Sequence, residues 1–124
     1  MFWLEGSPDG VVMDPCSSYG KIGTIELKCP EGKTNHTPQE TMGDEFFYIK
    51  LVDGKPNLKK DHHLGYYIQV QLLMGVCGLQ WVDVVVYLFK GMIITRVPID
   101  KYYFDQVVCK ADTYVRRFLP QLMA

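Results

Sequence analysis

The sequence predicts an α/β fold in which helices flank a mixed β-sheet, and three observations predict it. Residues 81–89, WVDVVVYLF, form a nearly continuous apolar run of strand length, a pattern typical of a central strand buried on both faces. Residues 24–29 alternate apolar and polar side chains, as a strand with two unlike faces does. Two longer segments, residues 61–77 and 100–119, carry helix start and stop signals.

The chain begins with a predicted strand pair, or one bent strand, formed by residues 2–5 and 10–13 around a Pro-Asp-Gly turn. Residues 14–23 are rich in proline, serine and glycine, and we expect them to form a loop between strands. The alternating strand at residues 24–29 follows, and Pro30 stops its pairing because proline cannot donate to a ladder.

The middle of the chain predicts a hairpin. Residues 31–43 are polar and without a defensible period, so we expect a surface loop there. Residues 45–52 then have the pattern of a strand, Asp53-Gly54 is a strong turn signal, and residues 55–59 form the returning arm. The hairpin is interpreted as an excursion between the alternating strand and the helix that follows.

Asp61 is the predicted N-cap of that helix, which runs to about Cys77 and stops at Gly78. Its later turns are apolar nearly all round, so we expect it to be buried against the sheet. His62 and His63 stand at its start. Because adjacent helix residues diverge by roughly 100°, they are expected to be exposed residues rather than a metal-binding pair.

The end of the chain predicts a second hairpin and a last helix. A Lys90-Gly91 turn leads from the apolar strand into a strand at residues 92–97, and Asp100 caps the helix that Pro120 ends. The apolar residues of this helix recur at intervals of three and four, so one stripe is expected to pack on the sheet. The stripe consists of Phe104, Val107, Val108, Ala111, Val115 and Phe118.

Composition describes one ordinary globular domain, residues 1–124, with 48% hydrophobic and 22% charged residues. No run of 18 apolar residues predicts a membrane span and no signal peptide opens the chain, so we expect an intracellular protein of the nucleus or cytoplasm that is not secreted. The four cysteines lack zinc spacing and are expected to be reduced, with Cys29 and Cys77 packed as small hydrophobes.

The net charge of −1 excludes a surface coated in basic residues, so any nucleic-acid binding must come from a local patch. The basic residues that could form such a patch are Lys33, Lys55, Lys59, Lys60, Arg116 and Arg117. For each of them taken alone, a solvated surface charge is at least as good an interpretation.

The polar face of the strand at residues 24–29 carries the most specific chemistry. Glu26 and Lys28 project from the same face, and Asp9 lies in the preceding turn. Magnesium usually takes one or two carboxylates together with water and substrate oxygens, which Asp9 and Glu26 would supply, with the backbone carbonyl of Leu27 as a third ligand. Lys28 would orient the attacking water and offset charge on a phosphate. The layout predicts a divalent-metal site for cutting phosphodiesters.

Three motifs in this order resemble the YqaJ-like viral recombinase group, the lambda exonuclease family, within the PD-(D/E)XK nuclease superfamily. They are Ser7-Pro8-Asp9-Gly10, then Glu26-Leu27-Lys28-Cys29-Pro30, then Tyr66-Tyr67-Ile68-Gln69-Val70-Gln71. The resemblance implies a restriction-endonuclease-like core. Family members carry helices before the first motif, whereas only residues 1–5 and Gly6 precede it here, so the resemblance implies a domain that lacks those N-terminal helices.

The resemblance also implies a function and further site residues. Gln69 by itself is better interpreted as a helix-surface glutamine, but the family motif implies that it binds the attacking water or a phosphate oxygen, with Tyr66 beside it. The implied activity is a Mg²⁺-dependent deoxyribonuclease, with Mn²⁺ as an alternative metal, that resects double-stranded DNA ends as an exonuclease. The implied partners are duplex DNA ends, a single-strand annealing protein and further copies of the chain, but no membrane.

Two other functions are weighed against this one. The first is a catalytically weak or inactive remnant that binds DNA or a protein partner through an intact sheet. The second is a small enzyme of unrelated chemistry such as a cysteine hydrolase, which lacks a cysteine and histidine in any recognisable setting. Retention of Asp9, Glu26, Lys28 and Gln69 together favours the nuclease.

Overall fold

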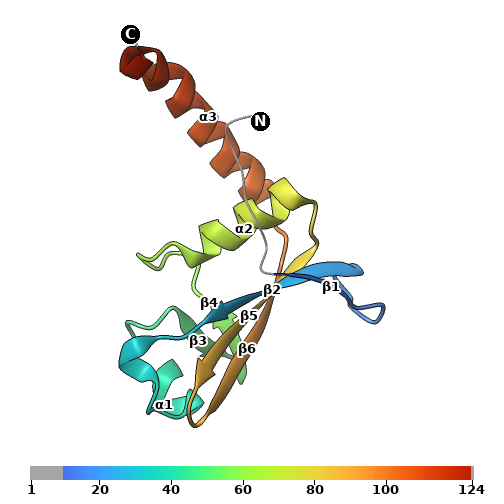
Figure 1. Ribbon diagram of the computed structural model, residues 1–124, viewed down its shortest axis with the longest axis vertical. Coiled ribbons are helices and arrows are strands. Elements are labelled where there is room, and N and C mark those ends of the chain that lie inside the picture. The colour runs from blue at the N-terminus through green and yellow to red at the C-terminus, as the bar shows by residue number, and fades with distance from the viewer. Residues whose placement is uncertain (1–9, 124) are drawn as a thin grey trace.

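The computed structural model describes residues 10–123, with side chains to residue 117 (Figure 1). The residues that precede Gly10 include the predicted strand 2–5 and Asp9, which therefore lie outside the described part of the chain. The described elements, in chain order, are β1 (Val11–Met13), β2 (Ile22–Lys28), the 3₁₀ turn η1 (Glu31–Lys33), α1 (Pro38–Met42), β3 (Ile49–Val52), β4 (Lys55–Leu58), α2 (Tyr66–Cys77), β5 (Trp81–Leu88), β6 (Gly91–Pro98) and α3 (Lys101–Met123).

The main sheet has the strand order β1-β2-β5-β6. Strands β2 and β5 run parallel, while β1 with β2 and β5 with β6 are antiparallel pairs. The parallel pair needs a long connection, which α1, the β3–β4 hairpin and α2 supply. The mixed sheet flanked by helices that the sequence predicts is confirmed at this level.

The β3–β4 hairpin forms its own two-stranded sheet. Its turn is the predicted Asp53-Gly54, and both residues have positive φ, 51° and 76°, as a tight primed turn requires. The Thr95 hydroxyl on β6 donates to the Pro56 carbonyl at 2.9 Å and ties the hairpin to the main sheet. The predicted strand at residues 45–52 starts only at Ile49, because Asp44 folds the preceding residues into a turn by accepting from the Phe46 amide at 2.9 Å.

The core lies between one face of the main sheet, the hairpin and α2. Alternate residues of β5 fill that face and are at most 1% exposed: Val82, Val84, Val86 and Leu88. The opposite face of β5 is different, because Tyr87 on it is 49% exposed. The prediction that β5 is buried on both faces therefore holds at Trp81, which is fully buried on this second face, but not at Tyr87.

Helix α2 begins four residues later than predicted, with Gly65 rather than Asp61 at its N-cap. Gly65, in the left-handed conformation at φ 69°, precedes it, and Gly78 at φ 70° ends it as predicted. Asp61 is not the N-cap, because the residues after it form a turn: the Gly65 amide donates to the His62 carbonyl at 3.0 Å, and the His62 ring binds the Phe46 carbonyl at 2.7 Å. The contact between His62 and Phe46, which are 16 residues apart in the chain, thus decides where α2 starts.

Residues 31–43 contain two short helical elements, where a loop was predicted. Helix α1 starts with a capping box: the Glu40 amide donates to the Thr37 hydroxyl at 3.1 Å, and the Thr37 amide donates to the Glu40 carboxylate at 3.2 Å. The Thr-Pro-Gln-Glu sequence is a recognisable start signal. Five residues are too few to show an apolar period, which is why periodicity missed this helix.

Helix α3 starts as predicted, with the Asp100 carboxylate accepting from the Tyr103 amide at 3.0 Å. Its apolar stripe does not pack on the sheet, however. The first turns contact α2, where the Tyr103 and Tyr67 rings meet edge to face at 4.9 Å, and the rest of the helix projects away from the sheet (Figure 1). The helix also continues past Pro120 to Met123, since a proline forfeits one hydrogen bond without always ending a helix.

Candidate active site

Strand β2 carries Glu26 and Lys28 on the core face of the sheet. Their neighbour Thr24 on that face is fully buried, and both residues are partly exposed because they lie toward the end of the strand. In the parallel register Glu26 lies opposite Val84 and Lys28 opposite Val86, both of which are core residues. The carboxylate and the ammonium therefore emerge at the border between the core and solvent.

Tyr66 brings the first turn of α2 against this face. The Lys28 ammonium lies 4.1 Å from the centroid of the Tyr66 ring, a cation–π contact. The Tyr66 ring in turn meets Tyr48 edge to face at 4.7 Å, and Tyr48 meets His62 at 5.9 Å. This stack of rings fixes the position of the ammonium from the side.

Tyr48 is a site residue that sequence reasoning missed. It is only 5% exposed, and burial, with smaller contributions from Tyr66 and Cys29, raises the pKa of Tyr48 above its usual range. The Tyr48 ring is therefore uncharged, and it packs against Tyr66. The available signal was the aromatic run Phe-Phe-Tyr at residues 46–48, which was interpreted as part of a strand.

The two glutamines of α2 have opposite surroundings. Gln69 is exposed, one turn after Tyr66 and on the same side of the helix. Gln71 is fully buried: its amide nitrogen donates to the Pro98 carbonyl at 3.0 Å, and its amide oxygen accepts from the Asp100 amide at 2.8 Å. Gln69 is thus available to a ligand, whereas Gln71 joins α2 to the start of α3.

The remaining predicted ligands are less well placed in the described structure. The Leu27 side chain is 60% exposed on the opposite face, so only its backbone carbonyl could serve a metal. Asp9 lies outside the described residues. In the sequence Asp9 stands two residues before Val11. Val11 pairs with Thr24, and Thr24 stands two residues before Glu26 on β2.

Cys29 is exposed, contrary to the prediction that it packs as a small hydrophobe, while Cys77 is half-buried.

The donor chemistry of this face fits a hard cation in part. Within residues 10–123 no group of three or more histidine, cysteine, aspartate or glutamate side chains could hold a metal ion. Glu26 supplies one carboxylate beside a fixed ammonium, and Mg²⁺ needs only one or two carboxylates from the protein. Glu26 is therefore the carboxylate on this strand, within the described residues, that could contribute to such a site.

The histidine pair does not form a metal site. The His62 and His63 rings lie 4.3 Å apart, and the His62 nitrogens are both engaged, one with the Phe46 carbonyl at 2.7 Å and the other with the Leu64 amide at 3.2 Å. His62 instead holds the turn that precedes α2, so its role is structural.

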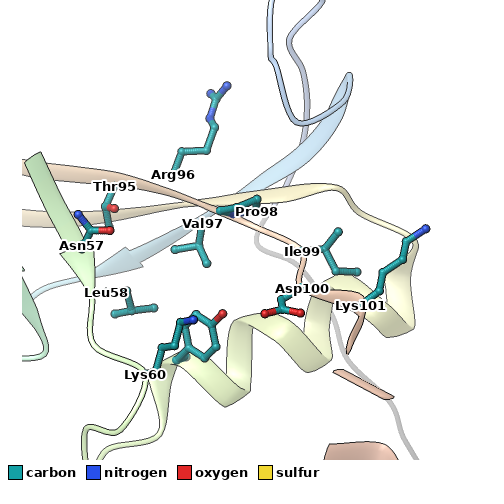
Figure 2. Close-up of a pocket in the computed structure, with 11 residues that line it drawn as sticks. Asn57, Leu58, Lys60, Thr95, Arg96, Val97, Pro98, Ile99, Asp100 and Lys101 are labelled. Atoms are coloured by element: carbon teal, nitrogen blue, oxygen red, sulfur yellow. The ribbon is translucent and has the colours of Figure 1, made fainter. Parts of the chain in front are cut away.

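A cavity of about 450 Å³ lies on the other side of the start of α2, between β4, β6 and α3 (Figure 2). Its polar walls are largely engaged within the fold: Thr95 donates to the hairpin, and Asp100 caps α3. Figure 2 shows the Arg96 side chain directed away from it. Burial, with Asp100 second, raises the pKa of Tyr67 in its wall. None of the predicted site residues lines this cavity.

Comparisons with known proteins give two similar solved structures. One is the crystal structure of LHK-Exo in complex with dAMP, with 26% identity and a TM-score of 0.49, over 92% of this chain and 54% of that one. The other is an alkaline exonuclease, LHK-Exo, from Laribacter hongkongensis, with 25% identity and a TM-score of 0.48, over 94% and 56%. The chain therefore spans about half the length of these structures.

No family model matches the sequence, and no curated protein matches it. No helix in residues 10–123 is long and apolar enough to cross a membrane.

Proposed function

We propose that the protein is a metal-dependent deoxyribonuclease that hydrolyses phosphodiester bonds at the ends of double-stranded DNA. The observation that carries the proposal is the fixed pair on β2: Glu26 and Lys28 share one face, and Tyr66 holds the Lys28 ammonium at 4.1 Å from its ring centroid. The sequence motifs in which these residues stand support the same chemistry.

Each residue has a separate task in this proposal. Glu26 and Asp9 hold Mg²⁺, or Mn²⁺ as an alternative, with the Leu27 carbonyl as a further ligand. The metal, when bound, supplies Lewis-acid stabilisation of charge on the phosphate and makes water a better nucleophile at neutral pH. Lys28 donates to the attacking water or to a phosphate oxygen, and the Tyr66 contact helps to keep its ammonium in place.

Gln69 completes the set from the helix side. Its exposed amide, one turn from Tyr66, can both donate and accept, which suits a group that orients water against phosphate. The partners that accord with this activity are duplex DNA ends and a single-strand annealing protein that receives the resected strand.

The test is digestion of linear duplex DNA, labelled at either end, with magnesium, with calcium and with chelator. Glu26→Gln and Lys28→Met each keep the side-chain size, and Lys28→Met keeps the packing on Tyr66. We expect each to lower the rate by about 10²-fold or more, since each removes a group that acts on developing charge. Lys21→Met, at an exposed position just before β2, is the matched control and should retain the wild-type rate.

Magnesium-only degradation that both variants lose would support the assignment, and the label lost first gives the polarity. Retained activity in Lys28→Met would refute the site. The second candidate is a DNA-binding module without catalysis. It predicts binding that is insensitive to metal and weakens with salt.

A further inference from the structure

The β3–β4 hairpin carries its basic residues on one of its two faces. Directly opposed residues of this antiparallel pair project from the same face, and the pairing continues one step past the strands, since the Lys59 amide donates to the Tyr48 carbonyl at 2.8 Å. Ile49 and Leu58 lie on the core face. The alternate residues form the other face, which we term the lysine face: Tyr48, Lys50, Val52, Lys55, Asn57 and Lys59. Three of these six residues are lysines and none is acidic.

The three lysines form a regular row of positive charge. Lys50 and Lys55 are exposed, and the Lys59 ammonium is held 2.5 Å from the Glu45 carbonyl. Each step of two residues along a strand advances about 7 Å, so Lys55, Lys50 and Lys59 follow one another at intervals of about 7 Å along the hairpin. A nucleic-acid backbone presents its phosphates at short and constant intervals, so it is the polyanion that such a row matches.

The row leads to the candidate active site. Tyr48 pairs with Lys59 at the end of the lysine face, and the Tyr48 ring meets Tyr66 edge to face at 4.7 Å. The Tyr66 ring in turn lies 4.1 Å from the Lys28 ammonium. Two ring contacts therefore join the lysine face to Lys28, and a DNA strand that leaves Lys28 along these rings would meet Lys59 first.

A hollow of about 350 Å³ lies where the lysine face meets the turn before α2. Its lining consists of Glu45, Phe46, Lys50, Lys59, Asp61, His62 and His63. The two carboxylates offset the two ammonium groups in this lining, so the hollow favours an uncharged group over a phosphate. The surplus of positive charge lies farther out on the lysine face, at Lys55.

Phe46 supplies an aromatic ring to this hollow. The side chain is 75% exposed, although the backbone of the residue is fixed on both sides. Its amide donates to the Asp44 carboxylate at 2.9 Å, and its carbonyl is bound by the His62 ring at 2.7 Å. Exposed aromatic rings beside a row of basic residues are how proteins bind single-stranded nucleic acid, because an unpaired base stacks on the ring.

We propose that the lysine face and Phe46 bind single-stranded DNA. Phosphates lie along Lys55 and Lys50, and an unpaired base stacks on Phe46 in the hollow, where the Glu45 and Asp61 carboxylates can accept from its amino groups. A duplex offers no free base face to the ring. The inference rests on the proposed function, because hydrolysis at a duplex end leaves one strand unpaired beside the site.

The experiment is fluorescence anisotropy of a labelled oligothymidylate, titrated with the purified chain in the presence of chelator. No metal-dependent hydrolysis occurs there, so a failure to bind and a failure to cut DNA are separate results. We expect the single strand to bind about tenfold more tightly than the same oligomer annealed to its complement, since one stacked base accounts for about that factor.

The lysines are tested by the salt dependence of binding. The double variant Lys50→Met, Lys55→Met should reduce the slope of log K against log salt by about 1.4, because each phosphate contact on a single strand contributes about 0.7. The matched control is the double variant Lys21→Met, Lys110→Met, which removes two exposed lysines outside the hairpin and should keep the wild-type slope. A wild-type slope in the hairpin variant would overturn the proposal.

The ring is tested separately from the charges. Phe46→Ala should weaken binding by about 5- to 150-fold with the salt slope unchanged, and Phe46→Tyr, which keeps an aromatic ring, should bind like wild type. On an abasic oligomer of the same length the effect of Phe46→Ala should vanish. Wild-type affinity in Phe46→Ala, or equal affinity of the unmodified chain for single strand and duplex, would refute the assignment of this surface to an unpaired strand.

Discussion

The substitution Gln71→Leu tests how the start of α3 is held. The leucine side chain keeps most of the volume but removes the amide's hydrogen bonds to the backbone, at 3.0 Å to the Pro98 carbonyl and at 2.8 Å from the Asp100 amide. Because Gln71 is fully buried, no water replaces it, and each backbone group left without a partner costs about 1–3 kcal/mol. We expect a total loss of about 2–4 kcal/mol in the free energy of unfolding.

The assay is urea unfolding followed by far-UV circular dichroism. With a slope of about 1–3 kcal/mol per molar urea, this loss lowers the midpoint by about 1–2 M. Gln69→Leu is the matched control on the same helix: Gln69 is exposed, so its stability should stay within about 0.5 kcal/mol of wild type while the nuclease rate falls. A Gln71→Leu midpoint within about 0.3 M of wild type would refute the bridging role of Gln71.

Two further predictions concern the sheet. Gly23→Ala should destabilise the fold by about 1–3 kcal/mol in urea, since a Cβ there would lie 2.1 Å from the Trp81 ring, whereas Gly32→Ala, which meets nothing within 4 Å, should not. The hydrogen bond from Arg96 holds the pKa of Asp14 in the folded protein below its ordinary value of 3.8. The ionised Asp14 carboxylate therefore stabilises the fold above pH 3.8, and this stabilisation is lost as the pH falls through the lower pKa of the folded state. Asp14→Asn should therefore unfold more readily than wild type at neutral pH, with the difference vanishing in acid; a constant difference would contradict the ion pair.

Local signals sufficed for much of the fold. The alternation at residues 24–29, the apolar run at residues 81–89 and the Asp53-Gly54 turn each correspond to an observed strand or turn. Gly78, which ends α2, and Asp100, which caps the start of α3, were also predicted from local sequence. A left-handed glycine and a side-chain cap depend only on residues that are close in the sequence.

These local signals could not predict contacts between segments that are distant in the sequence. The start of α2 at Tyr66 follows from the His62 contact with the Phe46 carbonyl, and the position of Tyr48 beneath Tyr66 follows from a loop that was taken for a strand. The alternation of Glu26 and Lys28 placed both on one side of a strand. It could not show that an aromatic ring of α2 would hold the ammonium there.

The sequence by itself determined the types of the longer elements, the mixed sheet and the pairing of an acid with a base on one strand face, because backbone periodicity decides which side chains share a face. Only the tertiary structure decided which faces are covered. The pattern of β5 and the stripe of α3 each predict an apolar surface that is buried in the fold. Because the hydrophobic effect is non-directional, neither pattern predicts which segment covers that surface. In the described chain α2 and the hairpin cover one side of the sheet, whereas the other side is buried at Trp81 and exposed at Leu27, Tyr87 and Ile94.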